Sequence, residues 1–154
     1  MRPVISSDSI VLDKEQQRPL YPILYRDLWH LFKKAEASFW TTEAIDIYQD
    51  RSDWSKALNP DDRIILSRML AAFAISSCNV SLYLTESLLK DVKYREAKFF
   101  FARQLMMENT HFESVSMLID QFVGDSDYVE DLFRDLHFSD SNIQQQNWLK
   151  DIAE

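Results

Sequence analysis

Residues 93–124 read KYREAKFFFARQLMMENTHFESVSMLIDQFVG and carry one helical pattern from end to end. Apolar side chains recur at intervals of three to four residues, which is the period of an amphipathic α-helix: Phe101, Leu105, Val115, Leu118 and Phe122. Glycine is favoured just past a helix end, so Gly124 predicts where this helix stops. The predicted helix is on the order of 40 Å long. A helix of this length with one apolar stripe is typical of a helical bundle.

A second long helix is predicted from Asn59 to about Lys90. Asn59 can cap the helix, Pro60 suits the first turn, and the two aspartates that follow favour the positive end of the helix dipole. One stripe runs along this segment through Leu66, Leu70, Phe73, Ser77, Val80 and Leu84. Two long helices that each carry one apolar stripe are typical of a helical bundle.

Shorter helical stretches surround this pair. They are predicted to begin after Pro22, at Thr42, at Tyr128 and near Asn142. Met1–Pro19 shows no helical period and is interpreted as an extended arm, so that residues 20–154 form one incomplete all-α domain. At 154 residues the chain suits a single domain.

Composition excludes several function classes. The single glycine rules out a P-loop and a dinucleotide-binding glycine motif, and it disfavours hairpin-rich β folds. The single cysteine, Cys78, excludes an internal disulfide and a cysteine-rich zinc site, and it favours a reducing, cytoplasmic location. A net charge of −8 without a basic run disfavours nucleic acid and anionic membranes. No apolar run approaches about 20 residues, so no membrane span is expected.

Two ionisable residues interrupt the apolar stripe of residues 93–123. Glu108 and His111 are three residues apart and so lie on the same side of the helix. A carboxylate on an apolar face needs a metal, a charge partner or a shifted pKa. Glu-x-x-His facing into a bundle is half of a di-iron site, but most such pairs are solvated or hydrogen-bonded. Spacing alone leaves these alternatives open.

The order of several short motifs resembles one enzyme family. The motifs are KKAEASFWT at Lys33–Thr41 with Glu43 and Asp46, then Leu70-Ala71, Phe73-Ala74, Ser76, Val80, Leu84 and Glu86, then Glu96-Ala97, Phe100 and Gln104, and finally MENTH at Met107–His111 with Leu118-Ile119-Asp120. Across Tyr21–Asp151 the chain resembles the first half of the small, radical-generating subunit of class I ribonucleotide reductase, eukaryotic type. The resemblance implies a ferritin-like bundle.

The resemblance also implies roles for individual residues. Glu108 and His111 match the first Glu-x-x-His pair of iron ligands. Trp40 matches the tryptophan that passes an electron between the iron site and the large subunit, although a core anchor is an equally good interpretation of a large side chain. Asp46 matches a position at a helix start that is not a ligand.

Two positions depart from the family pattern. Ser77 stands where the family has its first iron ligand, an aspartate, and serine cannot supply negative charge to oxidised iron. Val115 stands at the radical tyrosine, four residues after His111, and valine cannot hold a radical. Cys78 is about 100° around the helix from Ser77 and is interpreted as a small buried residue. The family's later ligands and its C-terminal docking tail have no counterpart before Glu154.

These features support three hypotheses. In the first, the chain is a degenerate small chain of ribonucleoside-diphosphate reductase, with the di-iron centre incomplete or absent in this chain alone. It would be a structural partner of an intact small subunit, together with the large catalytic subunit. In the second, it is a diverged, non-enzymatic helical module for binding or regulation. In the third, a partner chain completes a partial metal site at Glu108 and His111.

Overall fold

The computed structural model describes residues 19–153, and this part of the chain is helical without a strand. Residues 1–18, which hold nearly all of the expected arm, and residue 154 lie outside the described residues. The helical elements in chain order are α2 (Arg26–Ala37), η1 (Thr42–Ala44), α3 (Tyr48–Lys56), α4 (Pro60–Tyr83), η2 (Leu84–Leu88), α5 (Leu89–Asp91), α6 (Arg95–Phe122), α7 (Ser126–His137) and α8 (Asp140–Ala153). The expectation of an all-α fold is confirmed.

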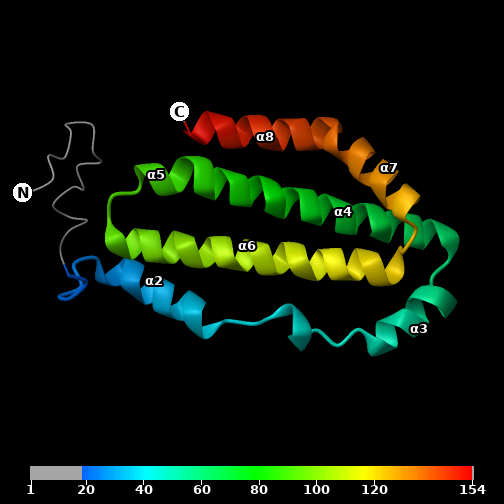
Figure 1. The fold of residues 1–154 in the computed structure, drawn as a ribbon, viewed down its shortest axis with the longest axis horizontal. Helices are drawn as coiled ribbons and strands as arrows, with labels where there is room; N and C mark the ends of the chain where they lie inside the picture. Colours follow the sequence, from blue (N-terminus) through cyan, green and yellow to red (C-terminus); the bar gives the residue numbers. More distant parts are fainter. Residues whose placement is uncertain (1–18, 154) are drawn as a thin grey trace, which may run out of the picture.

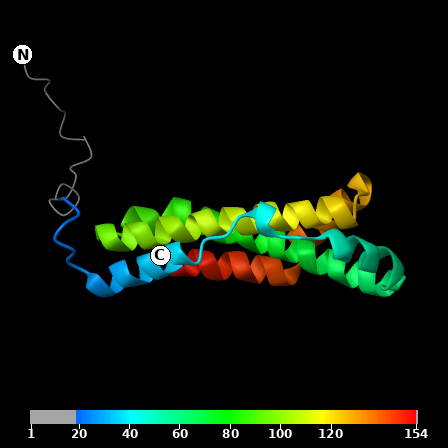
Figure 2. The same cartoon turned by 90° about the horizontal axis from the view of Figure 1, so that it is seen from below.

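The long helices α4 and α6 lie side by side and run in opposite directions (Figure 1). Helices α7 and α8 pack along α4, whereas α2, η1 and α3 contact α6. Figure 2, seen from below, shows the connection between α2 and α3 crossing this second side of the pair. The shorter helices thus pack on the pair formed by α4 and α6.

Helix α4 begins where its local signals predict. The Asn59 side chain accepts a hydrogen bond of 2.9 Å from the backbone N–H of Asp62, and Pro60 is the first helical residue. The helix then passes through a π-helical turn, η2, into α5 and stops at Asp91, close to the predicted end. Asparagine caps and first-turn prolines act within one turn, which is why sequence identifies them.

The ends of α6 and α7 also follow local chemistry. Gly124 has a φ of 67°, the left-handed conformation that glycine adopts at low cost just past a helix. The Asp125 carboxylate accepts hydrogen bonds from the backbone N–H groups of Asp127 and Tyr128 and so caps α7. Both predicted boundaries are confirmed to within two residues.

The first helix begins later than predicted. Helix α2 starts at Arg26, four residues after Pro22, because the intervening backbone is engaged elsewhere. The N–H of Leu24 donates to Oε1 of the fully buried Glu96 at 3.0 Å, a bond between residues 72 apart.

A further helix, α3, was not predicted, since its sequence has almost no apolar stripe. Its Trp54 stacks on Phe122 with ring centroids 5.2 Å apart.

The buried side chains of α4 are all small: Ser67, Ala71, Ala74 and Ser77. Ala71 and Ala74 are fully buried and Ser67 nearly so, which lets the two helices approach closely. Phe73, predicted to lie on the buried stripe, is 62% exposed because no described element covers that side of α4. Cys78, predicted to be buried, is exposed, so that prediction is wrong.

The segment Pro60–Asp91 is long and apolar enough to cross a membrane by length and composition. The sequence-based expectation that no segment is long and apolar enough to span a membrane is therefore not met when length and composition are the criterion. The core helix of a bundle satisfies the same criterion, and α4 packs against α6, α7 and α8.

Candidate functional site

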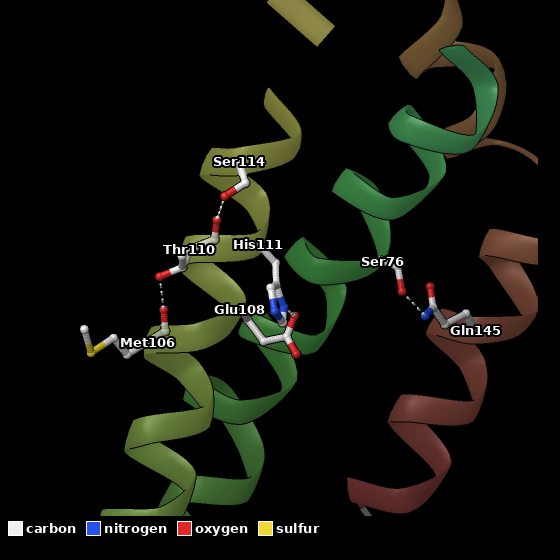
Figure 3. A network of polar contacts seen from close by, with 7 residues as sticks. All are labelled: Ser76, Met106, Glu108, Thr110, His111, Ser114 and Gln145. Atoms are coloured by element: carbon white, nitrogen blue, oxygen red, sulfur yellow. Dashed lines mark hydrogen bonds and ion pairs between the residues drawn. The ribbon is translucent and has the colours of Figure 1, made fainter. Parts of the chain in front are cut away.

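Glu108 and His111 lie one turn apart on α6 and extend toward α4 (Figure 3). The Nδ1 atom of His111 is 3.5 Å from Oε2 of Glu108. The Glu108 side chain is only 17% exposed, whereas that of His111 is 44% exposed. The spacing left open whether Glu108 has a metal, a charge partner or a shifted pKa. In the structure the Glu108 carboxylate has a polar partner on its own helix, the imidazole of His111.

Trp40 lies against His111. The two ring centroids are 5.7 Å apart and the ring planes are tilted by 33°. Trp40 belongs to the connection between α2 and η1, so this contact joins segments that are 71 residues apart in sequence (111 − 40). The structure therefore brings three of the predicted site residues together, and the contact is compatible with both interpretations of Trp40.

A pair of buried hydroxyls holds the segment after Trp40 on α6. Ser114 donates to the carbonyl oxygen of Thr110 at 2.7 Å, and its oxygen lies 2.9 Å from Oγ1 of Thr42 (Figure 3 shows the Ser114–Thr110 bond). Because serine has one hydroxyl hydrogen, Thr42 is the donor in the second bond. Sequence analysis missed this anchor. Its only signal was the spacing of Thr110 and Ser114, four residues apart on one helix face.

The start of η1 also carries a carboxyl group with a shifted pKa, that of Glu43. A backbone hydrogen bond and a hydrogen bond from the Thr41 side chain lower the pKa of Glu43 below its usual value. Glu43 is exposed, and it stands three residues after Trp40.

The positions that depart from the family pattern are placed on the two long helices. Ser77 is buried on α4, and Val115 is half-buried on α6 one turn beyond His111. Neither side chain can supply the charge or the phenol that the resemblance assigns to its position. At these positions Val115 therefore offers an apolar side chain, and Ser77 offers a neutral hydroxyl.

The side chains within residues 19–153 do not fit a di-iron centre by themselves. In this part of the chain no three His, Cys, Asp or Glu residues are grouped closely enough to hold a metal ion. A di-iron centre of this type takes carboxylates from four helices, whereas the available pair is one carboxylate and one imidazole from α6.

A separate polar network joins α4 to α8, and sequence analysis did not identify it. Asn79 Nδ2 donates to Oδ1 of Asn142 at 2.8 Å and to Oε1 of Gln145 at 3.1 Å. Gln145 Nε2 donates in turn to Ser76 Oγ at 2.7 Å (Figure 3). Asn142 also donates to the carbonyl oxygen of His137 at 2.8 Å. These neutral groups satisfy one another, so the network positions α8 and offers no reactive group.

Comparison with known proteins gives consistent matches. The family profile described as "Ribonucleotide reductase, small chain" matches residues 17–154. Ribonucleoside-diphosphate reductase small chain 1 of Saccharomyces cerevisiae is 39% identical over 139 residues, which cover 90% of this chain and 35% of the relative. Subunit M2 of Rattus norvegicus is 37% identical over 147 residues, which cover 96% of this chain and 37% of the relative.

A solved structure agrees with these relatives. The ribonucleotide reductase Rnr4 homodimer from Saccharomyces cerevisiae superposes with a TM-score of 0.72 at 32% identity, over 87% of this chain and 42% of that chain.

The antiparallel α4–α6 pair with Glu-x-x-His on one helix defines part of a ferritin-like bundle, as expected. The chain belongs to the ribonucleotide reductase small-chain family. It spans between about a third and two-fifths of the length of the relatives named above. The resemblance inferred from the motifs is thereby confirmed.

Proposed function

We propose that this chain is a degenerate small chain of ribonucleoside-diphosphate reductase that pairs with an intact small chain and supports its shape. In the family, the small subunit uses iron and oxygen to generate a radical that the large subunit needs for ribose reduction. This chain would take part in that complex, in the cytoplasm, without forming the radical itself.

One observation carries the proposal: the buried α4 position assigned to the first iron ligand is Ser77. Oxidised iron requires anionic oxygen ligands, and a serine hydroxyl is neutral and weak. The change at Val115 removes the radical phenol from the same region. Both positions lie within the matched residues 17–154, so they do not depend on the length of the chain.

Exposed apolar surface supports pairing with another chain. Large apolar side chains on the two long helices and on α8 are strongly exposed: Ile64, Ile65, Met69, Phe73, Leu82, Met106, Phe112 and Trp148. Extended apolar surface of this kind marks protein interfaces. The structural neighbour is a homodimer, which supports a small chain as the partner.

The deciding experiment measures metal content and association together. The chain is purified alone and after co-expression with an intact small chain, and iron is counted by mass spectrometry. We expect a stable complex in which iron belongs to the intact chain, and no iron in the chain alone. Iron near two atoms per isolated chain would overturn the proposal.

A variant separates the remaining hypotheses. Glu108→Ala is expected to leave both association and iron content of the complex unchanged. Loss of iron from the complex would favour a partial site that the partner completes. Capture of a partner unrelated to nucleotide metabolism, with no binding to either reductase subunit, would favour the non-enzymatic module.

A further inference from the structure

Residues 19–44, which we call the α2 strap, lie along α6 and bury little of their surface; Figure 1 shows α2 beside α6. Within the strap only Thr42 is buried, and α2 itself has no buried residue. Helices α4 and α6, by contrast, have four and six buried residues. Segments with few buried contacts open at a lower free energy than the core of the same protein. The α2 strap is therefore expected to detach more easily than either long helix.

The two ends of the α2 strap are each tied to α6 by a polar contact. At the first end the N–H of Leu24 donates to Oε1 of Glu96 at 3.0 Å, and at the second end Oγ1 of Thr42 lies 2.9 Å from Oγ of Ser114. Between these ends, two aromatic side chains of α2 lie with ring centroids 6.0 and 5.6 Å from that of Phe99. Because these contacts join the strap to one helix, the strap can leave α6 without disturbing the packing of α4 on α6.

Arg103 makes closure of the strap less favourable. Its guanidinium carbon lies 5.1 Å from the centre of the ring of Phe39, a residue of the strap, and the residue is only 8% exposed. Both terminal nitrogens, Nη1 and Nη2, are buried without a hydrogen-bond partner among the described residues. Arginine stays protonated in proteins, and contact with an aromatic ring compensates only part of the lost hydration. The closed strap therefore carries an unfavourable contribution that water would remove if the strap opened.

We propose that the α2 strap opens from α6 as one unit while the α4–α6 pair stays folded, and that hydration of Arg103 favours the open state. Opening separates Trp40 from His111, because Trp40 lies in the strap and His111 lies on α6. Helices α7 and α8 pack along α4 and keep their contacts. The strap is thus a switch that breaks the Trp40–His111 contact without unfolding the bundle.

Hydrogen–deuterium exchange of the unchanged chain, followed by mass spectrometry of its peptides, tests the opening. The chain is measured alone, so the result does not depend on whether it pairs with another small chain. We expect the amides of α2 to exchange at least about tenfold faster than those in the middle of α4. Low concentrations of urea should accelerate exchange in α4 and leave exchange in α2 nearly unchanged, because a local opening exposes less surface than global unfolding.

Two variants test the parts assigned to Arg103 and to the second tie. Arg103→Met removes the buried charge and should slow exchange in α2 by about tenfold, with Arg68→Met on the exposed side of α4 as the matched control. Thr42→Val removes one tie and should accelerate exchange throughout α2 by about fivefold, with the exposed Thr85→Val as its control. Neither variant should change exchange in α7.

Three outcomes overturn the inference. Exchange in α2 that is as slow as in α4, or that follows the urea dependence of α4, would show that the strap opens only when the whole chain unfolds. Faster exchange in α2 of Arg103→Met, or failure of that variant to fold, would show that Arg103 stabilises the closed strap. An effect of Thr42→Val that stays within η1 would show that the strap does not move as one unit; this measurement and that of the unchanged chain do not require any change at Arg103.

Discussion

Replacing Glu108 with methionine is expected to stabilise the isolated chain by about 1 kcal/mol. The Glu108 side chain is 17% exposed, so most of the methionine would be removed from water. Burying a methionine fully is worth about 1.5–3 kcal/mol relative to leaving it exposed. The change removes the contact with His111, and a helical pair at this spacing stabilises a helix by about 0.2–0.5 kcal/mol. Lost rotamer freedom takes a further part of the gain.

Thermal unfolding followed by circular dichroism measures this effect. For a chain of this size, 1 kcal/mol corresponds to a rise in Tm of roughly 3 °C. The matched control is Glu113→Met on the same helix, where the side chain is exposed and the expected change is within about 0.5 kcal/mol of zero. Each protein is measured with and without added Fe(II).

A metal role for Glu108 would produce the opposite pattern. A ligand present at a hundred times its Kd stabilises the folded state by about 2.7 kcal/mol. If Fe(II) raises the Tm of the unchanged chain by several degrees and Glu108→Met abolishes that rise, the carboxylate is a metal ligand and the reasoning is refuted. A fall in Tm for Glu108→Met without metal would refute the packing argument.

Three further predictions concern the elements around the site. Thr42→Val removes the hydroxyl that donates to Ser114 and should lower the free energy of unfolding in urea by about 1 kcal/mol. Thr85→Val is the control at an exposed threonine and should lower it by less. Equal losses for the two variants would contradict a special role for the buried Thr42–Ser114 pair. Asn142→Ala leaves the His137 carbonyl and Asn79 with fewer partners and should cost about 2 kcal/mol, with the exposed Asn147→Ala as the control. Because the pKa of Glu43 is lowered in the folded state, its contribution is present above its unfolded value of 4.5 and is lost as the pH falls below it. Stability measured across that range should therefore fall less steeply in Glu43→Gln, and an unchanged pH profile would contradict the assignment.

Sequence predicted the features that depend on neighbours within one or two turns. The Asn59 cap, the Gly124 stop and the Asp125 cap each act through backbone groups a few residues away. The shared face of Glu108 and His111 follows from their spacing on one helix. The family motifs were informative for the same reason, since their order along the chain is itself a sequence property.

Features that depend on distant segments were missed or mispredicted. Helix α2 starts late because Leu24 bonds to Glu96, and the stripe containing Phe73 stays open because no described element covers it. Burial is a property of what packs against a helix, and an apolar pattern does not reveal whether that partner is present. For this reason Cys78 is exposed although its type favoured burial.

By itself the sequence determined the all-α class, the family and the ends of the long helices. Tertiary structure alone decided that Trp40 lies against His111, that Thr42 anchors to Ser114, and that Arg103 is buried without an acceptor among the described residues. The physical reason is the range of the interactions. Helix periods, caps and motif order are encoded within a few turns, whereas contacts between segments about 70 residues apart exist only after the chain has folded.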